Sequence, residues 1–347
     1  MSEVLVQKNE KGLGSILLNR PESLNALDIS MIRKIKQTLD GWMKDDEVKV
    51  ILFSSTNERA FCAGGDIKAL YEAKLAGEDM EEASSFFVEE YELDGMIYTY
   101  PKPIIANLDG IVMGGGVGLT YGAPYKIVTE RTKWAMPEMN ISLYPDVGAS
   151  YFLNKAPGHI GRYVALTAKT FEASDVLYMN AANYYMNSDR LKKFLKSLEK
   201  TDWTAEADEE IKVLIEKFSE PLQEVSFLER HASQINEHFQ YETVEQIVDS
   251  LQKDESDFAK ETAQLLTSLS PVSLKVTLQL LIWAQGKTIE QCLEQDISIA
   301  KRFMKVEDFF EGVRSVLIDK DRNPSYKYKS LEEVSDNFVQ SFFNKEI

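Results

Sequence analysis

The sequence predicts an α/β protein whose first half alternates strands with helices and whose second half is almost entirely helical. Short apolar runs broken by glycine or proline continue to about residue 136, as expected of strands joined by turns. From about residue 175, charged segments with apolar residues at helical spacing replace them. We therefore place an α/β core at residues 1–180 and a helical region, which completes or caps that core, at residues 181–347.

The individual elements follow from turn and capping residues. A glycine-containing turn at residues 11–14 separates two short apolar runs and predicts a hairpin. Asp28 precedes apolar residues at helical spacing, so it is the expected N-cap of a helix that ends near Met43. We further expect strands at 48–53, 104–106, 111–113, 125–129 and 134–136, and helices from about 66, at roughly 81–98, at 191–198, at 206–218 and along 271–303.

The composition excludes several classes of protein. Apolar residues make up 44% and charged residues 27% of the 347 residues, so a large core needs no disulfide or metal. The formal charge of −17 disfavours a nucleic-acid-binding surface, which needs clustered lysine and arginine. No apolar run reaches the roughly 18 residues of a membrane span. Two distant cysteines, Cys62 and Cys292, and an N-terminus without a basic and apolar leader predict a reduced, cytoplasmic protein.

Several common catalytic motifs are missing from the sequence. The glycines at 114–118 do not fit the dinucleotide-binding pattern because Leu119 stands at its last glycine. No G-x-S-x-G sequence is present to carry a serine nucleophile. The histidines lack the spacing of zinc ligands, and His231 and His238 are expected on a helix surface. We therefore expect neither a metal nor a cofactor.

Two glycine-rich segments each follow a predicted strand and precede a predicted helix. The first, residues 61–67, contains Gly64 and Gly65, and the second, residues 109–118, contains the triple glycine 114–116. Glycine lets a ligand approach the backbone closely, and a helix start directs N–H groups to the same place. A plain strand-to-helix turn also explains either segment alone. Together they offer two N–H donors for one carbonyl oxygen, each typically worth roughly 3 kcal/mol of barrier.

The ordered combination of these segments resembles the enoyl-CoA hydratase/isomerase superfamily, which has the crotonase fold. The resemblance covers most of residues 15–170, through 19–21, 25–27, 61–67, 103–118 and 135–138. It implies a spiral of ββα units with C-terminal helices, and an acyl-coenzyme A thioester as ligand. It also implies an oxyanion hole formed by the N–H groups of Gly65 and Gly115, with substrate contacts from Ala26 and Ala63.

Acidic residues distinguish between the reactions of that superfamily. Its hydratases use two glutamates; Gly118 occupies the position of the first, and Glu138 matches the second. Asp146, eight residues after Glu138, resembles an acid of the 3-hydroxyisobutyryl-CoA hydrolase branch, as do segments 87–91 and 308–321. In that branch the residues matching Glu138 and Asp146 are the catalytic pair, and the residue matching Glu90 contacts substrate.

Each acid also has an ordinary interpretation: Glu138 as a loop residue, Asp146 as a helix N-cap, and Glu90 as part of a solvated helix face. In hydrolysis, Glu138 would attack the thioester or activate water, and Asp146 would orient it, hold the substrate hydroxyl or position water. We expect hydrolysis of a short branched 3-hydroxyacyl-CoA, with 3-hydroxyisobutyryl-CoA, an intermediate of valine catabolism, as the leading candidate.

The alternatives are an enoyl-CoA isomerase or hydratase and a non-catalytic acyl-CoA-binding protein. Coenzyme A is then part of the substrate and not a separate cofactor. We expect neither a nucleic-acid nor a membrane partner, and the resemblance leaves a homo-oligomer open. Tyr144 stands where phenylalanine is common in the branch, and Asp109 stands where some members have histidine. Both differences leave the catalytic pair intact and could tune the pocket.

Overall fold

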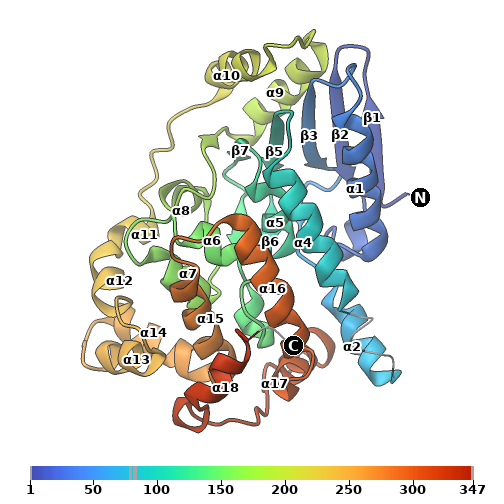
Figure 1. Ribbon diagram of the computed structural model, residues 1–347. Coiled ribbons are helices and arrows are strands. Elements are labelled where there is room, and N and C mark those ends of the chain that lie inside the picture. The colour runs from blue at the N-terminus through green and yellow to red at the C-terminus, as the bar shows by residue number, and fades with distance from the viewer. Residues whose placement is uncertain (1, 78–79, 81–83, 345–347) are drawn as a thin grey trace. The chain divides into compact units, whose positions relative to one another are not determined.

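The computed structural model describes residues 2–77, 80 and 84–344 (Figure 1). The chain divides into two compact units. Unit 1 consists of residues 1–65, 92–134 and 171–227, and unit 2 of residues 66–91, 135–170 and 228–347. Each unit is assembled from separate stretches of chain, so neither coincides with the stretches 1–180 and 181–347. Unit 1 holds the sheets, and unit 2 is built mainly from helices, which confirms the expected α/β class.

Unit 1 is organised around a six-stranded sheet with the order β1-β2-β3-β5-β7-β9. The strands β1 and β2 form the predicted antiparallel hairpin, and the following neighbours pair in parallel. Parallel neighbours need crossover connections, which the intervening helices supply. The strands are β1 Val4–Lys8, β2 Leu13–Leu18, β3 Val50–Ser55, β5 Ile104–Leu108, β7 Tyr125–Val128 and β9 Tyr184–Tyr185.

A second sheet of three short strands has the order β4-β6-β8, formed by Ala60–Cys62, Ile111–Met113 and Lys133–Ala135. The two glycine-rich segments follow β4 and β6 directly. The helices of unit 1 are η1 Pro21–Ser23, α1 Ile29–Met43, α5 Gly115–Tyr121, α8 Ala173–Tyr178, α9 Ser188–Lys200 and α10 Ala207–Phe218. Asp28 caps α1 as predicted, because its side chain accepts a hydrogen bond from the Met31 N–H.

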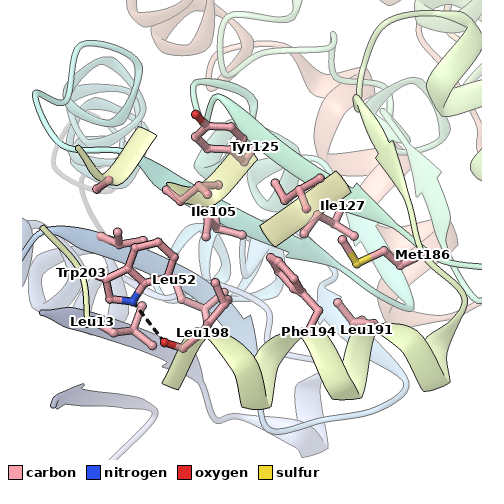
Figure 2. Packing of buried hydrophobic residues seen from close by; sticks show 14 residues of the cluster. Leu13, Leu52, Ile105, Tyr125, Ile127, Met186, Leu191, Phe194, Leu198 and Trp203 are labelled. Atoms are coloured by element: carbon pink, nitrogen blue, oxygen red, sulfur yellow. Dashed lines mark hydrogen bonds between the residues drawn. The ribbon is translucent and has the colours of Figure 1, made fainter. Parts of the chain in front are cut away.

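One apolar cluster of unit 1 lies between the six-stranded sheet and helices α9 and α10 (Figure 2). Leu191, Phe194 and Leu198 lie three and four residues apart on α9, so one face of that helix points into the core. The indole of Trp203 packs there and donates a hydrogen bond to the Leu198 carbonyl at 3.1 Å. Residues beyond position 180 thus complete the core of the strand-bearing unit.

Unit 2 contains α2 Ile67–Leu75, η2 Glu138–Ile141, α6 Ala149–Leu153, α7 Ile160–Thr167, α12 Ala232–His238, α13 Val244–Gln252, α14 Asp257–Ser268, α15 Pro271–Trp283, α16 Ile289–Phe303, α17 Glu307–Val313, η3 Arg314–Ile318, η4 Leu331–Glu333 and α18 Asp336–Ser341. Two further helices, α4 Ser85–Tyr98 and α11 Phe227–Arg230, contain residues of both units. The predicted start of α4 at residues 81–83 lies outside the described residues.

The predicted helical stretch 271–303 is two helices, α15 and α16, and not one. Gly286 between them has φ of 73°, a left-handed conformation that ends a helix. Thr288 and Gln291 then form a capping box that starts α16. Among the described residues, no single helix is long and apolar enough to cross a membrane; α14 and α15 pass that test only as a pair bent by 111°.

The core of unit 1 gives a stability test at Phe194, which is fully buried. Replacing it with alanine leaves a cavity, so the Phe194→Ala variant should lose about 3–5 kcal/mol of unfolding free energy. Urea denaturation followed by tryptophan fluorescence measures the loss. Val213→Ala on α10, where the valine is 68% exposed, is the control and should change stability by less than about 0.5 kcal/mol. Equal losses in both variants would contradict this packing.

Candidate active site

The two glycine-rich segments lie against each other in unit 1. A Cβ atom added to Gly64 would lie 3.2 Å from the Met113 carbonyl oxygen and 3.7 Å from the Gly115 nitrogen. A Cβ atom added to Gly116 would lie 2.7 Å from Cβ of Cys62 and 2.8 Å from its carbonyl oxygen. The start of α5 therefore approaches the end of β4 as closely as glycine allows.

A buried asparagine ties a third segment to this junction. Asn25 is fully buried with φ of 59°, and its side-chain amide donates to the carbonyls of Ala60 and Phe61 at 3.2 and 2.9 Å. Two backbone bonds join the same segments, from Ala63 N–H to the Leu24 carbonyl and from Leu27 N–H to the Gly64 carbonyl. These contacts bring the predicted substrate-binding residues Ala26 and Ala63 to the same junction as Gly65 and Gly115.

The N–H groups of Gly65 and Gly115 make no hydrogen bond to the part of the chain that the structure describes. Gly115 is the first residue of α5, where backbone N–H groups have no partner within the helix. Gly65 is half-buried and forms a parallel bridge with Leu27. Both N–H groups are therefore unpaired donors among the described residues.

Unit 2 brings together the three acids that the sequence singles out. Glu90 on α4, Glu138 at the start of η2 and Asp146 before α6 are 2%, 6% and 5% exposed. Glu90 Oε1 and Glu138 Oε2 have no hydrogen-bond partner among the described residues. The solvated interpretation of Glu90 is therefore wrong, and Glu138 is not an ordinary surface loop residue.

Burial governs the protonation of this cluster. It raises the pKa of Glu138 well above its ordinary value, and the charges of Asp146 and Glu90 raise it further. Burial, followed by repulsion from Asp146, also raises the pKa of Glu90 well above its ordinary value. Burial raises the pKa of Asp146 to about 6, opposed by hydrogen bonds from Tyr91 and from its own peptide N–H. Of these causes, the hydrogen bond from Tyr91 favours the ionised form of Asp146.

The side chain of Asp146 is held by a tyrosine and not used as a helix cap. The Tyr91 hydroxyl donates to Asp146 Oδ2 at 2.6 Å. The N-cap of α6 is Gly148, so the interpretation of Asp146 as a capping residue is wrong. Sequence reasoning missed Tyr91 as part of the site, although it directly follows Glu90 along the chain.

A fourth buried acid, Asp296 on α16, was also missed. Its Oδ2 accepts a hydrogen bond from the Gly148 N–H at 2.8 Å, and its Oδ1 has no partner among the described residues. Burial raises the pKa of Asp296 well above its ordinary value, and repulsion from Asp146 adds to the rise. The available signal was an acid among the apolar positions of an amphipathic helix, because Asp296 shares the buried face of α16 with Ile299 and Phe303.

Other side chains that the sequence analysis named have structural partners. Asp109 accepts hydrogen bonds from Thr129 and Arg131, and the Tyr144 hydroxyl donates to the Asp296 carbonyl at 2.7 Å. His238 is 2% exposed and bonds Ser250 and Asp254, so its predicted surface placement is wrong. Among the described residues, no group of three or more histidine, cysteine or acidic side chains has the arrangement of a metal site.

Comparison with known proteins places this geometry in a family context. A family profile described as enoyl-CoA hydratase/isomerase matches residues 13–343. A solved structure of a carnitinyl-CoA dehydratase from Mycobacterium thermoresistibile is 34% identical, with a TM-score of 0.92 over 100% of this chain and 97% of the other. An enoyl-CoA hydratase from Rhodobacter sphaeroides is 32% identical, with a TM-score of 0.89 over 99% and 97% of the two chains. These neighbours confirm the crotonase-type fold.

Curated relatives are similar over nearly the whole chain. The 3-hydroxyisobutyryl-CoA hydrolase, mitochondrial, of Gallus gallus is 40% identical over 346 residues, which is 99% of this chain and 89% of the relative. The Homo sapiens protein of the same name is 39% identical over 98% of this chain and 88% of its own. Both are named mitochondrial, which overturns the cytoplasmic assignment. That assignment rested on the first few residues and on cysteine usage, which do not define a compartment.

The contact at Gly116 predicts that the junction in unit 1 tolerates no side chain there. Alanine at this position would collide with the Cys62 backbone, so the Gly116→Ala variant should lose about 1–3 kcal/mol of unfolding free energy. Thermal or urea denaturation measures the loss. Gly41→Ala is the matched control, because Gly41 lies inside α1 with no atom within 4 Å of an added Cβ. This control should be neutral or stabilising; an unchanged Gly116→Ala variant would contradict the close approach.

Burial of Asp146 predicts that replacing this residue with a neutral one stabilises the folded protein. Because its folded pKa of about 6 exceeds the ordinary 3.8, the folded state binds more protons between these values, and stability falls as pH rises through that window. Asp146→Asn removes this penalty and should be about 1–3 kcal/mol more stable than the wild type above about pH 6. The difference should vanish near pH 4, as urea denaturation at both pH values can show. A variant that is less stable at both would refute the assignment.

Proposed function

Because the chain belongs to the enoyl-CoA hydratase/isomerase family, we propose that it hydrolyses a short branched 3-hydroxyacyl-CoA thioester, with 3-hydroxyisobutyryl-CoA as substrate. The reaction consumes one water molecule and yields the free hydroxy acid and coenzyme A. The observation that carries the proposal is the buried acid cluster of unit 2, with Glu138 and Asp146 at its centre. Relatives of about 40% identity that are named for this activity support it.

The glycine junction of unit 1 is the proposed oxyanion hole. During attack on a thioester, negative charge develops on the carbonyl oxygen, and fixed N–H donors stabilise it without reorganisation. The N–H groups of Gly65 and Gly115 fit this role because nothing else in the described chain accepts their hydrogen bonds. Ala26 and Ala63, which border the junction, are proposed to contact the bound acyl group.

Glu138 is proposed to supply the attacking or water-activating carboxylate. Its Oε2 has no partner among the described residues, and burial raises its pKa toward the range in which a carboxylate accepts protons effectively. Asp146 is proposed to hold the substrate hydroxyl or to orient the attacking group, and Glu90 to contact substrate as a neutral acid. Two acids with separated protonation states can divide donor and acceptor roles in this way.

A second candidate is hydration or dehydration of an enoyl-CoA. The solved structures with TM-scores of 0.92 and 0.89 carry the names of a dehydratase and a hydratase. Hydration in this family uses a glutamate at the position that Gly118 occupies here, and Gly118 is a buried residue of α5 with no acidic side chain. The acid inventory therefore favours hydrolysis.

Substitution of Glu138 tests the hydrolase directly. Glu138→Gln preserves the shape of the side chain but cannot attack the thioester or take a proton from water, so release of free thiol from 3-hydroxyisobutyryl-CoA should fall by about 10²–10⁴. Glu294→Gln, an exposed glutamate on α16, is the matched control and should retain wild-type rates. Equal thiol release by Glu138→Gln and the wild type would remove Glu138 from the mechanism.

The raised pKa of Asp146 also predicts the pH dependence of activity. If ionised Asp146 is required, kcat/KM should decline as pH falls, with the acid limb at about pH 6 or above and not near the ordinary 3.8. The rate of thiol release between about pH 4 and pH 9 measures this limb. A profile flat down to about pH 4 would exclude an ionised Asp146 from the rate-determining step.

A further inference from the structure

The hydrogen bond between Tyr91 and Asp146 stands out from the other contacts of the acid cluster. The donor–acceptor distance is 2.6 Å, and both side chains are buried, with Tyr91 1% exposed. A hydroxyl that donates to a carboxylate in a water-poor environment forms one of the stronger hydrogen bonds in proteins. The bond stabilises the ionised form of the acid more than the neutral form.

The Tyr91 ring has little freedom to leave this position. Phe87 precedes it by one turn of α4, and the two ring centroids lie 6.0 Å apart. Phe86 packs edge-on against Phe87 at 5.5 Å. The aromatic residues of the first turns of α4 thus fix the direction in which the Tyr91 hydroxyl points.

Asp146 is fixed from its other side by the loop that carries it. Val147 and Gly148 have φ of 52° and 77°, two successive left-handed residues. Such a conformation persists only where the surroundings impose it, and here the Asp296 carboxyl accepts the Gly148 N–H. The Tyr144 ring stacks on Phe303 of α16 at 5.3 Å, so the same helix holds both ends of the loop.

The charged and titratable groups around Asp146 come from every neighbouring element. Glu90 and Tyr91 lie on α4, Glu138 on η2, Tyr144 on the loop itself and Asp296 on α16. None of these groups is cationic, and the charge of Asp146 raises the pKa of Glu90, Glu138 and Asp296. Tyr91 is the side chain whose hydroxyl donates to the Asp146 carboxylate.

We propose that Tyr91 is a positioning residue that keeps Asp146 ionised within the acid cluster and fixes the direction of its carboxylate. The role in catalysis rests on the proposed hydrolase function, whereas the effect on Asp146 is a property of the folded protein. Tyr91 itself exchanges no proton with substrate. Its hydroxyl stabilises the carboxylate form of Asp146 through their direct hydrogen bond.

Infrared titration tests the proposal without relying on activity. The band of the protonated Asp146 carboxyl is identified by its loss in Asp146→Asn, and its midpoint is then compared between the wild type and Tyr91→Phe. Removal of the hydroxyl should raise the midpoint by about one pH unit, because the ionised form loses its donor. The acid limb of kcat/KM for thiol release should move upward by the same amount, with KM changing less than kcat.

The matched control is Tyr163→Phe, which also removes the hydroxyl of a fully buried tyrosine in unit 2, where the ring packs on Phe239 and Phe258. It should leave the Asp146 midpoint unchanged. An unshifted midpoint in Tyr91→Phe, or an equal shift in the control, would overturn the proposal. If the wild-type protein releases no thiol, the proposed function is wrong. The infrared midpoint would still test whether Tyr91 stabilises the ionised form of Asp146.

If Tyr91→Phe does not fold, the hydrogen bond can be followed from the tyrosine side instead. The ¹³Cζ resonance of Tyr91 in ring-labelled protein reports the hydrogen bond with the tyrosine intact. It should move when Asp146 is protonated by lowering the pH, and that movement should be absent in Asp146→Asn. A resonance that does not change with pH in the wild type would overturn the proposal.

Discussion

Burial of carboxyl groups that have no cationic partner among the described residues is the constraint on which the rest of the site depends. Glu90, Glu138, Asp146 and Asp296 are at most 6% exposed. Within the part of the chain that the structure describes, no lysine or arginine is among the groups that shift their pKa values. Removing charge from water is unfavourable, so burial raises the pKa of each of these groups. A fold that keeps such a cluster maintains an arrangement that stability alone would not favour, which is typical of functional sites.

The neighbouring structure supplies hydrogen bonds that favour the ionised form of Asp146. Asp146 receives the Tyr91 hydroxyl and its own peptide N–H, and its loop is anchored by Asp296. Among the described residues, Oε2 of Glu138 receives no comparable donor, which leaves that oxygen available for chemistry. Because their surroundings differ, otherwise similar acids have different pKa values, and one can donate a proton while another accepts one during a reaction.

Sequence patterns over a few residues predicted much of the fold. They did not predict contacts between residues that are far apart in the sequence. The hairpin and the Asp28 cap depend on residues a few positions apart, so their patterns predicted them. The break within 271–303 was also visible in Gly286 and Thr288, but helical periodicity on both sides concealed it. The position of His238 and the partnership of Tyr91 with Asp146, 55 residues away, arise from tertiary packing that no spacing rule encodes. The family resemblance identified the acids, whereas only the structure revealed how they are held.

The most direct test of the central claim follows two products in one experiment with the wild-type protein. Free thiol and enoyl absorbance are recorded together on 3-hydroxyisobutyryl-CoA and on a short enoyl-CoA. If the buried acid pair hydrolyses thioesters, one thiol is released for each 3-hydroxyisobutyryl-CoA consumed. The absorbance of the enoyl-CoA should change little. Rapid loss of enoyl absorbance without thiol release would contradict the account and assign the chain to the hydratases of its family.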